Sequence, residues 1–173
     1  MRRPLRTSST RDSLPSDRYR NAGEATVASR PRGLGVTGVY VCGVYLEHVA
    51  IVVDDYGPAI EFFVDVLGFE LVGDSPAMTT DGRPKRWVVV RPPGAQTGIL
   101  LARADGEHQV SAVGRQFAGR VGLFLRVADF EAVYQRMRAR GVDFVSEPRT
   151  EPYGRVAVFL DIAGNRWDLL GST

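Results

Sequence analysis

Cysteine is almost absent from this 173-residue chain, in which Cys42 is the only one. A single cysteine cannot form an intramolecular disulfide, and it excludes a metal site built from several thiolates. This composition fits a reducing compartment, so we expect the protein to be cytoplasmic. Histidine is nearly as scarce, because His48 and His108 are the only two.

Long hydrophobic runs are also missing. The longest apolar stretch, GLGVTGVYVCGVYL from Gly33, is shorter than the roughly 20 residues that a membrane-spanning helix needs. Its glycines and β-branched valines weaken helices, and no A-x-A cleavage site follows the basic stretch before it. We therefore expect no membrane partner and no export.

The small excess of positive charge is confined to one end of the chain. Residues 1–32 hold eight arginines against three acidic residues, which leaves the rest of the chain net negative although the total is +2. We therefore predict no nucleic-acid partner. Because residues 1–32 are rich in Arg, Ser and Pro and lack apolar periodicity, we interpret them as a disordered leader. A targeting segment is the alternative, since transit peptides share this composition.

The chain contains an internal repeat, in which the same order of predicted strands and helix occurs twice. Within residues 45–103 a strand (EHVAIVVDD) and an amphipathic helix (YGPAIEFFVDVLG) precede three strands (FELVGDSPAM, KRWVVVRP, TGILLARA). Within residues 119–171 a strand (VGLFLRV) and a helix (ADFEAVYQRMRARG) again precede three strands (VDFVSEP, GRVAVFLD, NRWDLLGS). Residues 104–118 are the expected linker between the two modules.

The two halves can be aligned with one another. Asp55 matches Asp129, LGFEL matches RGVDF, and RPPG matches DIAG. Each half is a βαβββ unit too small to bury its own sheet face, so the two are expected to pack together. We predict an α+β fold in which two tandem modules form one incomplete barrel-like, cup-shaped sheet with the helices outside.

Three segments of this pattern are similar to a known family. HVAIVVDD, AIEFFVDVLGFELV and EPYGRVAVFLDIAGNRWDLL resemble the vicinal oxygen chelate superfamily, whose G-N-x-x-E ending is similar to G-N-R-W-D here. That superfamily includes glyoxalase I, extradiol dioxygenases, fosfomycin-modifying enzymes and bleomycin-resistance proteins. The resemblance covers about residues 45–171 and implies the fold more specifically than an activity.

The resemblance also implies where a metal would bind. Family members that hold a divalent cation use up to four ligands, whose positions correspond here to His48, to Gly98 or Ile99, to Gly122, and to Asp168. Only His48 and Asp168 can coordinate, and this pair suits Zn, Fe, Mn or Ni. Two other interpretations of the pair stay open: a hydrogen bond between two inward-facing polar groups, or a general base with the residue that orients it.

The expected ligand is a small oxygenated organic molecule. Aromatic and arginine side chains are suited to wall such a ligand and to bind its oxygens, and our candidates are Trp87, Phe124, Arg126, Tyr153 and Arg155. We assign no catalytic residue. His108, in the linker, could add a ligand only if the linker folds over the cup, and a solvated loop is the simpler interpretation.

Two main functions remain open at this point, beside a third in which the protein is a scaffold that acts through the Arg-rich leader and its partners. One is metal-assisted lyase, isomerase or dioxygenase chemistry with an incomplete ligand set, in which the metal polarises oxygens of the substrate. The other is metal-free binding or sequestration of a small molecule, as in bleomycin-resistance proteins. Because family members often dimerise, we also expect a homodimer, with the modules pairing either within one chain or between two.

Overall fold

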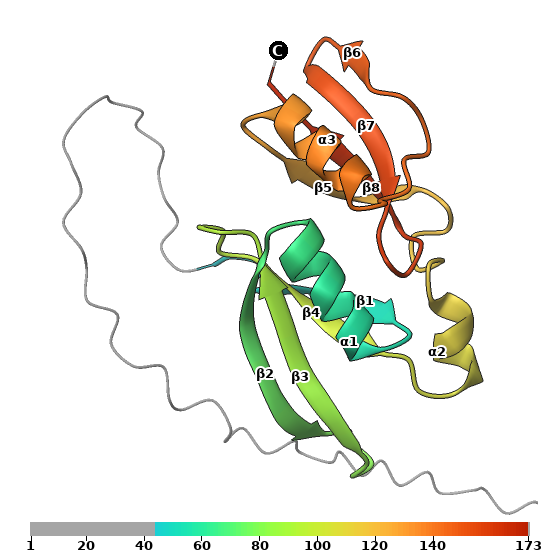
Figure 1. Ribbon diagram of the computed structural model, residues 1–173. Coiled ribbons are helices and arrows are strands. Elements are labelled where there is room, and N and C mark those ends of the chain that lie inside the picture. Colours follow the sequence, from blue (N-terminus) through green and yellow to red (C-terminus); the bar gives the residue numbers. More distant parts are fainter. Residues whose placement is uncertain (1–43, 173) are drawn as a thin grey trace, which may run out of the picture. The chain divides into compact units, whose positions relative to one another are not determined.

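The computed structural model describes residues 44–172, and the predicted leader at residues 1–32 and Cys42 lie outside this range. The first module contains β1 (His48–Val53), β2 (Glu70–Met78), β3 (Pro84–Arg91) and β4 (Gly98–Arg103) (Figure 1). These strands form a four-stranded sheet in the order β1-β4-β3-β2. β1 pairs with β4 in parallel, and the other two ladders are antiparallel.

The second module repeats this arrangement. Its sheet contains β5 (Val121–Arg126), β6 (Arg149–Glu151), β7 (Gly154–Leu160) and β8 (Arg166–Leu170) in the order β5-β8-β7-β6. The predicted α+β fold with tandem βαβββ modules is therefore confirmed. Within the described residues the strands form two separate open sheets of four strands, and no ladder joins them into one.

The two module helices begin with equivalent aspartates. Asp55 caps α1 (Tyr56–Glu61) by accepting a hydrogen bond from the Tyr56 N–H at 2.8 Å. Asp129 caps α3 (Phe130–Ala139) by accepting one from the Ala132 N–H at 3.0 Å. Side-chain acceptors at this position satisfy N–H groups that have no partner inside the helix. The match between Asp55 and Asp129 in the repeat thus reflects helix capping.

The structure differs from the sequence-based expectation at three points. The helix from Tyr56 changes after six residues into a π-helical turn, η1 (Phe62–Val66). The strand expected over VDFVSEP is reduced to a single bridge between Phe144 and Phe159, and β6 lies just after it. The linker contains a short helix, α2 (Glu107–Ala112), which carries His108 on an exposed turn.

Each sheet has one face toward the helix of its module. In the first sheet, Ile51, Val88 and Leu101 are fully buried on the face that packs against α1 and η1. Because strand residues alternate between faces, the intervening positions form the opposite face, which we call the open face. In the second sheet, Phe159 and Trp167 point toward the core on the α3 side, and their sequence neighbours belong to the open face.

One hydrophobic core includes residues from both modules. Phe63 of η1 lies with its ring centroid 5.9 Å from that of Trp167 in β8. The linker adds a polar connection, because the Gln116 side chain accepts from the Val52 N–H at 2.7 Å and donates to the Ala50 carbonyl at 3.1 Å. Gln116 thereby satisfies backbone groups at the edge of β1 that pair with no strand among the described residues.

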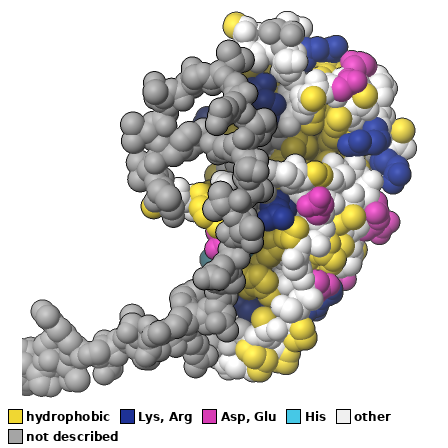
Figure 2. Space-filling view, turned by 90° about the vertical axis from the view of Figure 1, so that its left-hand side faces the viewer, with side chains coloured by type: hydrophobic (Ala, Val, Ile, Leu, Met, Phe, Trp, Pro, Cys, Tyr) yellow, Lys and Arg dark blue, Asp and Glu magenta, His cyan; other side chains and the backbone are white. Residues whose placement is uncertain are grey.

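Charged side chains do not gather by sign on the surface shown in Figure 2. On this face, Lys and Arg side chains are interspersed with Asp, Glu and hydrophobic ones.

In residues 44–172 no helix is long and apolar enough to cross a membrane.

A buried carboxylate organises the turn between β7 and β8. Asp161 is 5% exposed and accepts from the Ala163 N–H at 3.0 Å and the Asn165 N–H at 2.9 Å. Its other oxygen accepts from the Asn165 side-chain amide at 3.1 Å and the Trp167 indole N–H at 2.9 Å. The G-N pair of the sequence therefore has a structural role, because Asn165 holds the aspartate that fixes the turn.

Replacement of Asp161 should destabilise the fold strongly. In Asp161→Ala, four buried or partly buried N–H donors lose their acceptor, so we expect the free energy of unfolding to fall by about 3 kcal/mol or more. Urea denaturation of the full chain measures this. Asp143→Ala is the matched control, because Asp143 is exposed and its side chain makes no hydrogen bond within the described residues. Equal stability of the Asp161 and Asp143 variants would contradict the structural role.

Candidate functional site

His48 and Trp87 lie together on the open face of the first sheet. His48 begins β1, and the Trp87 ring of β3 meets the imidazole edge to face, with 6.1 Å between centroids and 89° between ring planes. Trp87 is 41% exposed, although an indole of this size usually lies in a core. This face therefore presents an imidazole and an aromatic surface side by side.

The position opposite His48 is a glycine for a steric reason. Gly98 is the register partner of His48 in the parallel ladder between β1 and β4. A Cβ atom at Gly98 would lie 2.8 Å from Val89 Cγ1, which is closer than side chains pack, and 3.0 Å from His48 Cδ2, which is tighter than most such contacts. The imidazole and Val89 thus occupy the space that a ligand side chain at residue 98 would need.

Asp168 and Phe124 lie together on the open face of the second sheet. They are register partners on β8 and β5, and Phe124 is 63% exposed. Oδ1 of Asp168 is buried without any hydrogen-bond partner in the described part of the chain. Burial raises the pKa of Asp168, and the positive charge of Arg149 opposes this shift in part. A buried acceptor without a donor is unfavourable in a folded protein, so this oxygen is suited to a donor from outside the chain.

A neighbouring ring also fills the third metal-ligand position, Gly122. A Cβ atom at Gly122 would overlap the ring of Phe117, a linker residue that packs directly on the glycine. The glycine was predicted from the sequence, whereas Phe117 and Arg149 were not. Arg149 lies in β6, which is two strands from Asp168 in the sheet. Because the sequence predicted a strand over VDFVSEP instead of β6, it gave no reason to place Arg149 near Asp168.

The remaining candidates fall in different surroundings. Arg126 donates to the Gly171 carbonyl at 3.3 Å, and Tyr153 is 56% exposed in the turn before β7. Arg155 lies on the α3 side, where it pairs with Glu131 at 3.1 Å and its guanidinium stacks 5.0 Å from the Phe130 ring centroid. Arg155 therefore does not share the open face with Asp168. The binding roles of all five candidates stay predictions.

These residues do not complete a metal site. His48 and Asp168 supply one donor group each, and within residues 44–172 neither a hydrogen bond nor an ion pair joins them. No group of three or more His, Cys, Asp or Glu in this range is placed to hold a metal ion. A catalytic metal generally needs about three protein ligands and an open position. The donor set does not fit such a metal, and we assign no reaction step to one.

The fold agrees with comparisons to known proteins. Residues 45–169 match the Glyoxalase/Bleomycin resistance protein/Dioxygenase superfamily, and the chain belongs to this superfamily. An uncharacterised protein of Shewanella frigidimarina is 48% identical over 126 residues, which cover 72% of this chain and 91% of the relative.

Two solved structures are similar over most of the described residues. TnmS3, an antibiotic binding protein from Streptomyces sp. CB03234, is 30% identical with a TM-score of 0.61, covering 78% of this chain and 100% of its own. A superfamily member from Sphaerobacter thermophilus is 31% identical with a TM-score of 0.58, covering 75% of this chain and 98% of its own. The family resemblance predicted from sequence is thus confirmed.

The environment of Asp168 predicts a pH-dependent effect of replacing it. Because burial raises the pKa of the folded state, the ionised carboxylate disfavours folding at neutral pH, and this cost is lost as the pH falls through the raised pKa. We expect Asp168→Asn to be more stable than the wild type at pH 7. The difference should shrink as the pH approaches the ordinary aspartate pKa of about 4.

Urea unfolding of both proteins over this pH range tests the effect. Asp143→Asn removes the same charge from an exposed position and serves as the control. If the Asp168→Asn variant is less stable than the wild type at neutral pH, the carboxylate has a stabilising partner after all and the expectation is wrong.

Proposed function

We propose that this protein binds a flat organic molecule on its open faces without a resident metal, as a binding or sequestering protein. The observation that carries the proposal is the buried Oδ1 of Asp168, which lacks a donor within the described residues and lies beside the exposed ring of Phe124. A planar ligand can stack on Phe124 while its own N–H or O–H group donates to Asp168. This arrangement recognises a ring that carries a hydrogen-bond donor or a positive charge.

The similarity to TnmS3 supports this assignment. TnmS3 is an antibiotic binding protein, and the present chain matches its full length at 30% identity. Binding needs no ordered set of metal ligands, which agrees with the glycines at two of the four positions and the side chains packed against them. On this proposal His48 and Trp87 form a second aromatic wall of the same kind.

Metal-assisted chemistry is the second candidate. The unpartnered Oδ1 of Asp168 favours it, because a divalent cation would also satisfy that atom. Zn, Fe, Mn or Ni would then be held by His48, Asp168 and water. Two protein ligands bind such ions weakly, so we place this function behind metal-free binding. The single cysteine and the expected absence of export are consistent with either function in the cytoplasm.

We further propose that the protein is a homodimer. Both open faces expose aromatic side chains, Trp87 on one and Phe124 on the other, and exposed aromatic surface is characteristic of interaction sites. A symmetric pair of chains would let the open face of one copy enclose a ligand held by its partner.

Ligand binding should persist in the presence of a chelator. We expect 9-aminoacridine, a planar cation, to raise the melting temperature of the full chain in EDTA, because a ligand that binds only the folded state stabilises it. Phe124→Ala and Asp168→Asn should each weaken binding about tenfold, as expected for the loss of a stacking or charge-assisted contact. Ile162→Ala and Asp143→Asn remove an exposed apolar side chain and an exposed charge elsewhere and should leave affinity unchanged.

Ligand binding measured with and without added metal separates the two candidate functions. If binding appears only after Zn, Fe, Mn or Ni is added, and is lost in His48→Ala, metal-free binding is wrong. If the planar cation binds equally well to the Asp168 variant and the wild type, the proposed contact with Asp168 is wrong.

The oligomeric state can be measured directly. We expect sedimentation equilibrium to give twice the 19.0 kDa mass of the chain. Phe124→Glu, which places a charge on the exposed aromatic surface, should shift the equilibrium toward the single chain if that surface is part of the interface. A wild-type protein that stays at the mass of one chain at all loading concentrations would disprove the dimer.

A further inference from the structure

A cavity opens where β3 and β4 separate. The two strands pair only between Val88 and Leu101 and between the two residue pairs that follow, ending at Val90 and Ile99. However, β3 begins four residues before Val88, at Pro84, and β4 runs two residues beyond Leu101, to Arg103. The ends of the strands therefore splay apart in the middle of the first sheet.

The hydroxyl group of Tyr56 holds this separation open. It donates to the Arg86 carbonyl at 3.1 Å and accepts from the Arg86 N–H at 3.3 Å. Arg86 lies in the part of β3 that forms no ladder with β4, so the hydroxyl supplies a partner for both of its backbone groups. Tyr56 is 5% exposed, so its ring is fixed by the core while its hydroxyl satisfies the backbone of β3. The gap is thus a built feature of the fold.

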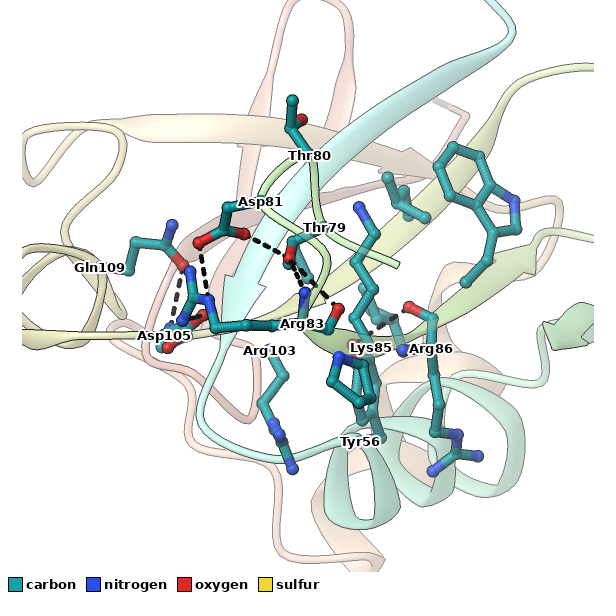
Figure 3. Close-up of a pocket in the computed structure, with 16 residues that line it drawn as sticks. Tyr56, Thr79, Thr80, Asp81, Arg83, Lys85, Arg86, Arg103, Asp105 and Gln109 are labelled. Atoms are coloured by element: carbon teal, nitrogen blue, oxygen red, sulfur yellow. Dashed lines mark hydrogen bonds and ion pairs between the residues drawn. The ribbon is translucent and has the colours of Figure 1, made fainter. Parts of the chain in front are cut away.

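The cavity at this gap has a volume of about 800 Å³, which is within the range of small-molecule sites. Figure 3 shows the polar residues of its lining, which come from α1, the two splayed strands, the turn between β2 and β3, and the segment after β4. Trp87, Leu100 and Ala102 add apolar surface to the lining. Both apolar and polar contacts are therefore available to a ligand.

Most charges around the cavity neutralise one another. Arg83 pairs with Asp81 at 2.9 Å and also with Asp105, which connects the β2–β3 turn to the segment after β4 (Figure 3). Arg86 pairs through two nitrogens with Asp74, at 3.0 and 2.5 Å. The carboxylates near the cavity are therefore already engaged by these two arginines.

Two cations of the lining are left over. Within the described residues, neither Lys85 nor Arg103 has a carboxylate within ion-pair distance, and neither carries a dashed line to an acid in Figure 3. Strand alternation puts them on opposite sides of the gap. Lys85 is on the face of Trp87, and Arg103 is on the face of Tyr56, with its guanidinium 5.7 Å from the Tyr56 ring centroid. Lys85 is also the only lysine in the chain.

We propose that this cavity binds an organic anion, of the class of an aryl carboxylate. Its ring would pack on Trp87 and Leu100 while its acidic group is attracted by Lys85 and Arg103 from the two sides of the split sheet. This site goes beyond the proposed function, because it lies at the splayed end of the first sheet and selects negative charge, whereas Phe124 and Asp168 select a donor or a cation. The two sites have only the Trp87 surface in common.

The two tryptophans of the chain supply a local readout. The Trp87 indole lines the cavity, whereas the Trp167 side chain is 3% exposed and its indole N–H donates a hydrogen bond to Asp161. In an NMR titration of the full ¹⁵N-labelled chain with 2-naphthoate, we expect the Trp87 indole N–H signal to shift saturably and that of Trp167 to stay in place. The neutral isostere 2-naphthamide should cause no saturable shift of Trp87.

Charge-removing variants identify the cations that attract the ligand. Lys85→Gln and Arg103→Gln should each weaken 2-naphthoate binding about tenfold, the effect expected for losing a hydrogen bond or ion contact to a charged group. Arg120→Gln is the matched control, because it removes one positive charge from an exposed residue outside the cavity lining. Affinity should also fall when ionic strength rises to about 0.15 M, where the Debye length is about 8 Å.

Three results would overturn the proposal: no saturable shift of Trp87 with 2-naphthoate, equal binding of the amide, or equal affinity of the Lys85, Arg103 and Arg120 variants. Asp168→Asn keeps the test separate from the proposed function, since it should leave 2-naphthoate binding unchanged. If this variant lost 2-naphthoate binding, the anion would belong to the open-face site and the second site would be wrong.

Discussion

The second module depends on one buried carboxylate, that of Asp161. Burying an ion is costly unless its oxygens are fully satisfied, and here four N–H groups donate to it. The backbone N–H groups of Ala163 and Asn165 fix the turn. The hydrogen bond from the Trp167 indole fixes the start of β8, with the ring in the core against Phe63. Because neighbouring strand residues point to opposite faces, holding Trp167 inward sends Asp168 to the open face. Core packing and the candidate site are therefore consequences of the same turn.

The parts of the fold that sequence predicted well are those set by local backbone requirements. Asp55 and Asp129 recur because both helices need a side-chain acceptor at their first turn. Gly68 and Gly141 recur because the chain leaves each helical segment with φ of +78°, which residues with a Cβ atom rarely adopt. Short-range signals of this kind are visible in one sequence and survive in both halves, so the repeat reveals the two modules and their order.

The candidate site was predictable only in part, because its decisive contacts join residues far apart in the chain. The sequence shows glycine at residues 98 and 122, but only the structure shows that His48 and Phe117 occupy the space beside them. The predicted strand VDFVSEP had suitable β-branched and aromatic residues, yet only Phe144 pairs, and Arg149 in the true β6 is the cation that acts on Asp168. The gap between β3 and β4 likewise depends on a long-range contact, because the Tyr56 hydroxyl bonds to Arg86 in β3, 30 residues further along the chain.

The two modules share one topology, and each contains polar groups without a partner among the described residues. In the first, Lys85 and Arg103 are cations without acidic partners among the described residues; in the second, Asp168 is an acceptor without a donor there. These unpaired groups do not stabilise the fold, and a single substitution at a neighbouring position could give each of them a partner. Stability alone would also have favoured continuing the β3–β4 ladder over holding it open with Tyr56. On the two functions that we propose, the unpaired groups mark surfaces where ligand recognition, rather than folding, determines which residue is present.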